Sequence, residues 1–553
     1  MTSSPRFSII TPVHNPRPAD LEMMLASVRA QSFDDYEHCI VDDGSTAPHV
    51  VPALRSAATR DSRLKLDVLP APAGIVGATN AALAMASGEF VAFLDHDDML
   101  HPSALSSVDA AIAAHDDIDY LYTDEDKIDS DNNHFDPFLK PDWSPERFRT
   151  QMYTCHLSVA RRALVEEVGA LRPGFDGAQD WDLVFRLAER ARRIIHVPQV
   201  LYHWRTAPTS AAGGVEAKPW AYEAAHRVIA EHIERSGLQA QVEELPGWPG
   251  HFRLRPALRD HPLVSIVVPT GGFVRQVYGW PVKLVVNTVR SIIERSTYEN
   301  VEILAVIDDV VDDGTRAELV DLGVRLVPFP REFSFSQKIN VGAVHARGDY
   351  LLLLNDDVEV LPEHWRDTWP SLEGRSSWIE AMLLYALDQG VGAVGAKLYF
   401  ADTRLQHVGL ACTGAGPGHI YRGFPRDFGG PFNNARLPAN YLALTGACLM
   451  TRRDAFENVG GFSQDFPINF NDVDYCFKLY RSGYRNVFTP DAELLHFESS
   501  SRVPHVLPEE LQDLRRRWLD LLEHDPYYNP QLVQGRPNFI APPYFRSGEF
   551  VRG

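Results

Sequence analysis

The sequence predicts an α/β protein built from two tandem copies of one domain, each with a mostly parallel, Rossmann-like sheet, followed by a helix and a proline- and aromatic-rich tail. Short apolar runs, FVAFL at 90–94 and YLLLL at 350–354, are typical of strands buried on both faces. Segments with helical spacing, such as LEMMLASVRAQ, alternate with these runs, as they do in βα units. The same blocks then occur a second time in the same order, which indicates two copies of one fold.

Each copy contains the same series of blocks. It opens on a β-rich run that ends in proline (FSIITP, VSIVVP) and continues to an apolar run that ends in two aspartates. An asparagine lies 17 residues before an acidic cluster, and a late block has an aspartate 18 residues before a proline, with a histidine soon after. The matched positions are Pro12 and Pro269, Asp42–Asp43 and Asp308–Asp309, Asn80 and Asn340, Asp97 and Asp357, Asp180 and Asp472, Pro198 and Pro490, and His203 and His496.

The repeat predicts the domain boundaries. We expect a first domain over residues 1–235, a linker over 236–261, a second domain over 262–505, and a C-terminal helix and tail over 506–553. The linker carries the turn and proline signals of a boundary. The tail, YYNPQLVQGRPNFIAPPYFR, is too aromatic for a disordered segment, so we expect it to pack on a domain.

Composition excludes some classes of function. The formal net charge of −21 disfavours nucleic acid as a partner. The five cysteines are scattered and form no CxxC pair, which favours a reducing compartment. The sequence has neither a signal-peptide pattern nor an apolar run of about 18 residues. We therefore expect a cytoplasmic protein, which a lipid-linked acceptor would bring to the inner face of the membrane.

The acidic clusters predict a site for a divalent cation. Asp95, Asp97 and Asp98 directly follow an apolar strand, where crowded carboxylates repel each other and lose solvation. Mg²⁺ or Mn²⁺ relieves both costs and binds substrate phosphates as well. A solvated loop is the alternative, but the second copy repeats the cluster at Asn355–Asp357 and favours the metal site.

Other repeated side chains could bind substrate or only stabilise the fold. The aspartate pairs could accept hydrogen bonds from a nucleobase or ribose, or belong to turns. Asp180 and Asp472 begin predicted helices, where each could be a cap or a general base, with Asp182 and Asp474 in support. His203 and His496 could be metal ligands or ordinary histidines.

With these residues, the chain resembles glycosyltransferase family 2, of the GT-A fold, twice over. The resemblance covers about residues 5–235 and 262–505. It rests on IITPVHN, IVDDGST, GATNAALAMASGEFVAFLDHDD, FSFSQKINVGAVHARGDYLLLLNDDVEV and GGFSQDFPINFNDVDYCFKLYRSGYRNVF. It implies an inverting transfer from UDP-, dTDP- or GDP-linked sugars to an oligosaccharide or lipid-linked glycan, as in bacterial enzymes that assemble O-antigen, capsule or rhamnan polysaccharides.

The resemblance also implies roles for individual residues. In the first copy, nucleotide contacts come from the Pro12 strand end, Asp43 and Asp95. Asp97 binds Mn²⁺ or Mg²⁺ with His203, and Asp180 is the base. The expected equivalents in the second copy are Asp309, Asn355 or Asp356, Asp357, His496 and Asp472.

Three alternatives remain at this point. The second copy departs from the family pattern in IDDVVDDGT, PTGG and Asn355, so one copy could be an acceptor-binding module beside a single catalytic copy. A non-catalytic carbohydrate-binding scaffold is the second alternative, although binding alone needs no base. A sugar nucleotidyltransferase is the third, but neither copy opens with a glycine-rich basic loop. The segment 405–425, with His407, His419 and Tyr421, could bind the acceptor or be structural.

Overall fold

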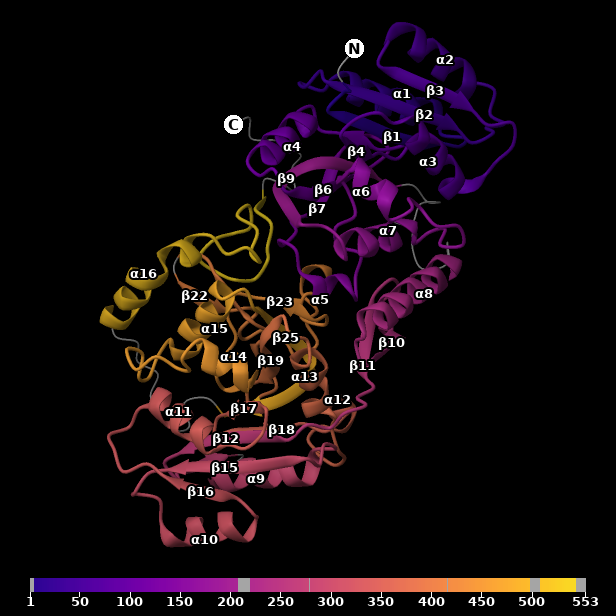
Figure 1. The fold of residues 1–553 in the computed structure, drawn as a ribbon. Helices are drawn as coiled ribbons and strands as arrows, with labels where there is room; N and C mark the ends of the chain where they lie inside the picture. The colour runs from indigo at the N-terminus through magenta and orange to yellow at the C-terminus, as the bar shows by residue number, and fades with distance from the viewer. Residues whose placement is uncertain (1–3, 207–218, 278, 415, 498–507, 544–553) are drawn as a thin grey trace.

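The computed structural model describes residues 4–206, 219–277, 279–414, 416–497 and 508–543, and the expected boundary at 505/506 lies outside these residues. Two α/β halves lie one above the other, each around its own large sheet (Figure 1). The fold class predicted from the repeat is confirmed.

The N-terminal sheet has the strand order β3-β2-β1-β4-β8-β6-β9-β5, and β7 pairs with β6. Its β1, β2, β3 and β4 are parallel neighbours, and β6 is parallel to β9, whereas β8, β5 and β7 run antiparallel to their partners. The strands are β1 (Phe7–Val13), β2 (Tyr36–Asp42), β3 (Leu64–Val68), β4 (Phe90–Phe93), β5 (Met99–Leu100), β6 (Ile118–Ile128), β7 (His134–Phe138), β8 (Ser158–Arg161) and β9 (Arg193–Arg205).

The C-terminal sheet has the equivalent order, β16-β15-β12-β17-β24-β19-β25-β18. Outside this path, β20 pairs with β19 and β23 pairs with β25. Every neighbour along this path has the same direction as its counterpart in the first sheet. The strands are β12 (Val264–Thr270), β15 (Val301–Ile307), β16 (Arg325–Pro328), β17 (Tyr350–Leu354), β18 (Val358–Val360), β19 (Val391–Tyr399), β20 (Leu405–His407), β23 (Ala439–Asn440), β24 (Cys448–Arg452) and β25 (Arg485–His496).

Helices connect and cover the strands in both halves (Figure 1). Those of the first half are α1 (Pro18–Arg29), α2 (Val50–Arg60), α3 (Gly74–Met85), α4 (Ala104–Ala113), α5 (Pro145–Phe148), α6 (Arg162–Glu167), α7 (Gln179–Ala188) and α8 (Pro219–Ser236). Those that follow are α9 (Leu284–Arg295), α10 (Asp313–Asp321), α11 (Phe335–His345), α12 (Trp365–Thr368), α13 (Trp378–Ala386), α14 (Arg453–Asn458), α15 (Asn471–Arg481) and α16 (Pro508–Glu523).

The repeated asparagine has the same structural role in both halves. Asn80 of α3 accepts a hydrogen bond from Leu171 N (3.1 Å) and donates one to Leu171 O (2.9 Å). Asn340 of α11 makes the same pair of bonds with Phe462 N (2.9 Å) and Phe462 O (2.8 Å). The side-chain amide thereby hydrogen-bonds both the backbone N–H and the backbone C=O of a buried loop residue, as a neighbouring strand would. It also fixes the segment that leads to α7 or α15.

The repeated glycine is explained by close packing against the first strand of each sheet. A Cβ atom on Gly88 would lie 2.7 Å from Phe7 C, and one on Gly348 would lie 2.3 Å from Leu263 O. Such contacts cannot be relieved by a side-chain movement, because the obstructing atoms belong to the backbone.

The segment expected to be a linker forms a hairpin of β10 (Ala240–Glu244) and β11 (Phe252–Pro256). Together with α8, this hairpin runs down one side of the molecule from the upper half to the lower half (Figure 1). It also bonds to both halves, since Phe252 N donates to Thr150 O (2.9 Å) and Arg253 lies 2.6 Å from Asp491. Two further hairpins lie in the second half, β13 (Val274–Val277) with β14 (Trp280–Lys283) and β21 (Leu410–Cys412) with β22 (Pro417–His419).

The two halves also contact each other directly and through the tail. Ser144 Oγ donates to Asn440 Oδ1 (2.8 Å), and Arg485 lies 3.0 Å from the fully buried carboxylate of Glu146. The tail packs between the halves: Asn529 Nδ2 donates to Asp124 Oδ2 at 2.8 Å, and the yellow chain of Figure 1 passes there. The described part of the aromatic tail, up to residue 543, is therefore part of the interface.

Candidate active sites

The acidic clusters occupy the same place in both halves, directly after β4 and β17. The strand register aligns Phe90 with Tyr350, because each is the partner of the first residue of the neighbouring strand. Counting along the chain then aligns Asp97 with Asp357 and Asp95 with Asn355. The same count places His96 opposite Asp356 and Asp98 opposite Val358.

Asp98 fastens the first cluster to β9. Its Oδ2 accepts a hydrogen bond from the Tyr202 hydroxyl (2.6 Å), and its Oδ1 accepts one from Arg205 N (2.7 Å). Burial and the charges of Asp95 and Asp97 raise the pKa of Asp98 well above its usual range. Burial also raises the pKa of Asp97, with a contribution from Asp95. Burial and mutual repulsion thus outweigh the positive charge near the cluster, and a divalent cation would stabilise its ionised form.

Asp180, at the start of α7, faces the same cluster. Loss of water from its surroundings and the charge of Asp95 raise the pKa of Asp180 to about 6, although the side chain remains accessible to solvent. Gln179 Nε2 donates a hydrogen bond to Asp180 Oδ2 (3.1 Å). A carboxylate with a pKa near the working pH is suited to accept a proton.

His156 adds a positive charge beside Asp95, Asp98 and Asp180. Burial alone would lower the pKa of His156, but its contacts with Glu125 and the charges of Asp95 and Asp98 raise it to about 9. Its Nδ1 lies 3.4 Å from Glu125 Oε2. Asp95, Asp98 and His156 could place three ligand atoms within 4.8 Å of one another, but an imidazolium cannot bind a cation. We therefore assign His156 an electrostatic role, in which its positive charge stabilises the neighbouring carboxylates.

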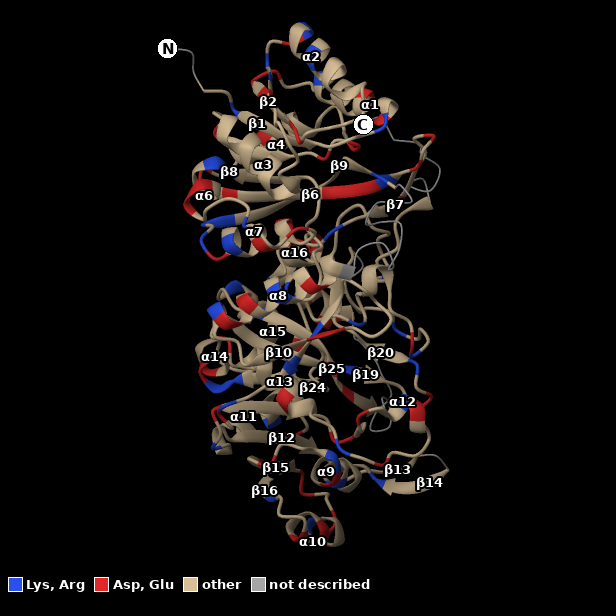
Figure 2. Cartoon of the chain, turned by 90° about the vertical axis from the view of Figure 1, so that its right-hand side faces the viewer, with Lys and Arg blue, Asp and Glu red and all other residues tan. Residues whose placement is uncertain are grey.

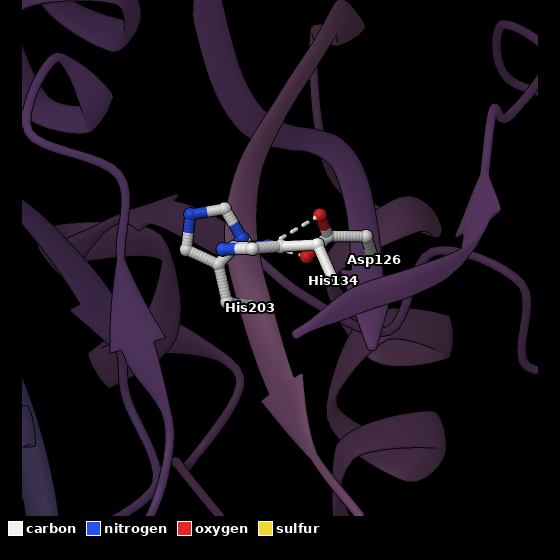
Figure 3. A group of neighbouring side chains, drawn as sticks. All are labelled: Asp126, His134 and His203. Carbon is white, nitrogen blue, oxygen red and sulfur yellow. Dashed lines mark hydrogen bonds and ion pairs between the residues drawn. The ribbon is translucent and has the colours of Figure 1, made fainter. Parts of the chain in front are cut away.

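His203 lies against a residue that the sequence analysis did not select. Its Nδ1 is 2.6 Å from Asp126 Oδ1, and His134 Nδ1 is 2.9 Å from the other oxygen of the same carboxylate (Figure 3). The three residues could place ligand atoms within 4.8 Å of one another. Although burial opposes it, hydrogen bonds from the two histidines lower the pKa of Asp126.

The acidic residues of β6 are the main functional candidates that sequence reasoning missed. Asp124, Glu125 and Asp126 are all buried within this strand, and Figure 2 shows the acidic colour along β6. Lys140 Nζ lies 3.0 Å from Glu125, and His196 Nε2 lies 2.8 Å from Asp124. The signal was present in the run YTDEDK, which has three consecutive acids inside a β-rich segment, whereas residues 95–98 have three acids in four positions.

In the second half the predicted metal residues meet directly. His496 Nε2 is 3.1 Å from Asp357 Oδ1 and 3.2 Å from Asn355 Nδ2, while its Nδ1 faces Gln406 Oε1 (2.8 Å). Asp356 Oδ2 accepts a hydrogen bond from the Thr270 hydroxyl (2.6 Å). Burial and the neighbouring Asp357 raise the pKa of Asp356 to about 7.

Asp472, which begins α15, accepts hydrogen bonds from Gly446 N (2.8 Å) and Val473 N (2.9 Å). Unlike Asp180, it is thus held by backbone donors from two segments. The neighbouring aspartates, Asp182 and Asp474, are ion-paired instead: Asp182 binds Arg172 and Arg186, and Asp474 lies 2.9 Å from Arg517.

The aspartates after the second strand of each sheet require one correction. The register pairs Pro12 with Val41 and Pro269 with Val306, which makes Asp308, and not Asp309, the equivalent of Asp43. The expected match with Asp309 was wrong because the first apolar run is one residue shorter before its aspartates. Asp309 itself is exposed.

These equivalent aspartates contact the following helix in different ways. Asp43 Oδ2 accepts from Gly74 N (3.0 Å) at the start of α3, whereas Asp308 lies 2.7 Å from the fully buried ammonium of Lys338 on α11. Asp42 Oδ1 and Asp308 Oδ1 are buried oxygens for which the described residues provide no hydrogen-bond donor. Such an atom is expected to have a partner in the working protein.

A cavity of about 240 Å³ opens next to the first cluster and is lined by residues of both halves. Its aromatic walls are Phe138, Trp204 and Phe432, the last contributed by the second half. Cys155 connects the cavity to the cluster, because burial and then the charges of Glu125 and Asp180 raise the pKa of its thiol. Phe138 and Phe432 stack with their ring centroids 3.7 Å apart.

Within the segment 405–425, the two histidines lie near the second cluster, whereas Tyr421 lies in the hydrophobic core. His407 Nδ1 lies 2.9 Å from His419 Nδ1, and burial, with nearby His419 and His496, lowers the pKa of His407 well below its usual value. These histidines therefore border the second cluster. Tyr421 is 1% exposed and packs in the core, which favours the structural interpretation for this residue.

Among the helices in the described ranges, none is long and apolar enough to cross a membrane.

Comparison with known proteins gives a family match in both halves. The model described as Glycosyl transferase family 2 matches residues 8–169 and 277–460, and that described as Glycosyl transferase family group 2 matches residues 423–519. The chain is 38% identical over 98% of its length to the uncharacterized protein y4gI of Sinorhizobium fredii. It is 36% identical over 96% of its length to the O-antigen biosynthesis protein RfbC of Myxococcus xanthus. It spans only 59% and 41% of the lengths of these two relatives.

Solved structures also match part of the chain. TarS of S. aureus is 24% identical over 41% of this chain and 65% of its own, with a TM-score of 0.34. The mannosyltransferase PcManGT of Pyrobaculum calidifontis, solved with GDP-Man and Mn²⁺, is 19% identical over 42% of this chain and 65% of its own, with a TM-score of 0.32.

Proposed function

Because this chain belongs to glycosyltransferase family 2, we propose that it transfers sugars from nucleoside-diphosphate-sugar donors to a growing polysaccharide or lipid-linked glycan, with inversion at the anomeric carbon, and that both halves are active. One observation carries the proposal. In each half an aspartate after the fourth strand (Asp97, Asp357) and an aspartate at the start of a late helix (Asp180, Asp472) occupy equivalent positions. A scaffold that only binds sugar would not need the second aspartate.

The donor nucleotide would lie at the carboxyl ends of the first strands, where open α/β sheets bind their ligands. Pro12 and Pro269 lie in these strand ends. The unpartnered oxygens of Asp42 and Asp308 could accept hydrogen bonds from a nucleobase N–H or a ribose hydroxyl. Asp43, Asp95, Asn355 and Asp356 complete the proposed nucleotide contacts.

A divalent cation, Mn²⁺ or Mg²⁺, fits both clusters. In the first half Asp97 would hold it with Asp98 in support, whereas the expected ligand His203 lies against Asp126 and His134 instead. In the second half Asp357 and His496, which lie 3.1 Å apart, would hold it. The raised pKa values of Asp97 and Asp98 support this, because burial and repulsion between the carboxylates outweigh the nearby positive charge. When bound, the cation would stabilise negative charge on the departing diphosphate.

Asp180 and Asp472 would act as general bases. Each would take the proton of the acceptor hydroxyl while that oxygen forms a bond to the anomeric carbon and the bond from this carbon to the diphosphate oxygen breaks. A positioned base contributes about 10²–10⁴-fold to such a step. His156, whose pKa of about 9 keeps it protonated, would offset the charge of Asp95 beside the reacting groups.

The acceptor of the first half would enter the cavity walled by Phe138, Trp204 and Phe432. Ligand sites are often found at domain interfaces, and aromatic rings offer flat apolar faces. The name of the Myxococcus relative, an O-antigen biosynthesis protein, supports a polysaccharide product. A lipid-linked acceptor would then bring this cytoplasmic protein to the inner face of the membrane.

A single active half is the second candidate. The second cluster has Asn355 in place of Asp95 and Val358 in place of Asp98, so it contains less negative charge for a cation. In that case the C-terminal half would hold the acceptor glycan for the first half.

Calorimetric titration of UDP, dTDP and GDP, with Mn²⁺ and then with EDTA, tests the proposal. We expect two metal-dependent nucleotide sites per chain, of which Asp97→Ala removes one and Asp357→Ala the other. A single site that is lost only in Asp97→Ala would establish the single-active-half candidate. No binding of any nucleoside diphosphate would refute the transferase assignment and favour a carbohydrate-binding scaffold.

A further inference from the structure

A second kind of cavity lies in the C-terminal half, between β11, the loop after β18, β19 and the middle of β25. It has a volume of about 280 Å³. We call this cavity the basic pocket. Its basic lining residues are Arg253, Arg255, Arg366, Lys397, Arg426 and Arg436. Four acidic residues also line it, so six positive side chains face four negative ones in a chain whose net charge is −21.

The lining acids neutralise only part of this charge. Arg253 lies 2.6 Å from Asp491, and Arg366 is paired with Glu493. Arg426 has its carboxylate partner outside the lining, at 3.6 Å from the largely exposed Asp427. Arg255 lies 2.9 Å from Glu243 and 3.8 Å from Glu363. Of the six basic side chains, Lys397 and Arg436 are therefore the two for which the described residues give no ion pair, and their charge remains inside the cavity.

Lys397 is the clearest sign of a missing partner. It is 4% exposed, and its ammonium group donates one hydrogen bond, to Ala435 O (2.7 Å). An ammonium group has three donors, and the carboxylate that acts on it most, Glu493, is already paired with Arg366. Burial lowers the pKa of Lys397 to about 7, which shows how poorly its charge is compensated. The nearby Arg436 has a buried Nε that likewise has no hydrogen-bond acceptor.

The equivalent position in the first half is filled. Through β24 and β8 the register aligns Ala393 with Tyr120, and hence Lys397 with Asp124. The tail covers Asp124, because Asn529 Nδ2 donates to its carboxylate at 2.8 Å. In the second half the same place on the sheet is an open cavity lined by cations.

The basic pocket is separate from the proposed donor site. Glu493 and His496 lie three residues apart on β25, so the alternation of side chains along a strand directs them to opposite faces of the sheet. The pocket is also smaller than the roughly 300–1,000 Å³ that drug-sized ligands occupy, and is too small for a complete nucleotide sugar.

We propose that the basic pocket binds a small phosphate-bearing ligand, of the size of a sugar phosphate, at a site distinct from both donor sites. Lys397 and Arg436 would donate to the phosphate oxygens, and Arg426 would add its charge at the entrance. The remaining acidic residues would accept hydrogen bonds from hydroxyl groups of the ligand.

Calorimetry with glucose 1-phosphate and with inorganic phosphate, in EDTA and on the full chain, tests this proposal, with glucose as the uncharged control. We expect one site per chain for glucose 1-phosphate and no binding of glucose. Lys397→Met and Arg436→Gln should each weaken the binding at least about tenfold, since a hydrogen bond to a charged group contributes roughly 1.5–3 kcal/mol. Lys283→Met, which removes an ammonium paired with Glu318 elsewhere in the same half, should leave binding unchanged.

The double variant Asp97→Ala/Asp357→Ala separates this proposal from the proposed function, because it disrupts both donor sites. Glucose 1-phosphate should bind to it as to the unchanged chain. Glucose 1-phosphate binding that disappears in the double variant but persists in Lys397→Met and Arg436→Gln would overturn the proposal, as would no binding at all. Stronger binding of inorganic phosphate than of glucose 1-phosphate would restrict the pocket to the free anion and overturn the sugar phosphate.

Discussion

At the scale of single residues, Asp180 sets a limit on the pH at which the first half can work. A base must be ionised before it can accept a proton, and the pKa of Asp180 is about 6. With Asp472→Asn present to silence the second half, we expect the rate of transfer to be constant above about pH 7 and to fall about tenfold per unit below pH 6. Product formation measured from pH 5 to pH 8 tests this expectation.

A matched variant completes that experiment. Asp180→Asn should remove transfer at every pH while nucleotide affinity stays as it was, because Asp180 is not among the proposed nucleotide contacts. A rate that stays flat down to pH 5, or transfer that survives in Asp180→Asn, would contradict its role as the base.

The two halves also differ in the contacts that their matched residues make. Asp43 accepts hydrogen bonds at the start of α3, whereas its equivalent Asp308 pairs with buried Lys338. His203 faces Asp126, while His496 faces Gln406. Since the partners of these residues differ in charge, we expect the two halves to prefer different nucleotides or to bind them with different affinities.

At the scale of elements, α16 is attached to the second half through Asp474. This fully buried carboxylate accepts hydrogen bonds from Arg517 Nη1 and Trp518 Nε1, both at 2.9 Å. In Asp474→Ala the two donors lose their acceptor, and we expect α16 to detach more often. Limited proteolysis should then cut within residues 508–523 at least several times faster than in the unchanged chain.

Asp513→Ala is the control for this element. Asp513 also belongs to an ion pair of α16, with Arg516, but that pair is exposed and contributes little. Equal proteolysis of the unchanged chain and Asp474→Ala would show that apolar packing, such as that of buried Leu514, is sufficient to hold the helix.

At the scale of the whole molecule, Glu146 connects the two halves. Its carboxylate is fully buried and lies 3.0 Å from Arg485, which is 339 residues away. In Glu146→Ala, Arg485 loses its partner across the interface but keeps Asp388 of its own half at 2.7 Å, so we expect a cost of about 1.5–3 kcal/mol, that of a hydrogen bond to a charged group. We expect Glu146→Ala to uncouple the halves, so that calorimetry resolves two unfolding transitions at lower temperature instead of one.

Glu243→Ala tests whether this effect is specific. Glu243 pairs with Arg255 at 2.9 Å on the exposed hairpin, and loss of such a pair should change stability by less than about 1 kcal/mol. An unchanged thermogram for Glu146→Ala would mean that the tail and Ser144 are enough to join the halves.

The sequence by itself determined the two copies, their alternation of strands and helices, and the positions of their acidic clusters. These features rest on local signals, namely apolar runs, turn residues and fixed spacings. The chain repeats the signals because each half needs the same hydrogen bonds from Asn80 or Asn340 and the same close packing at Gly88 or Gly348. Sequence spacing also located Asp180 and Asp472, although whether each is a base stays a prediction.

Only the tertiary structure decided which side chains meet. The pairing of Asp126 with His203 joins residues 77 positions apart, and the two side chains meet only because the register of β6 against β9 places them opposite each other. The same is true of the match between Asp43 and Asp308, which spacing placed one residue off. The interface at Glu146 and the filling of the pocket at Asp124 by the tail depend on segments hundreds of residues apart, and no local pattern encodes such contacts.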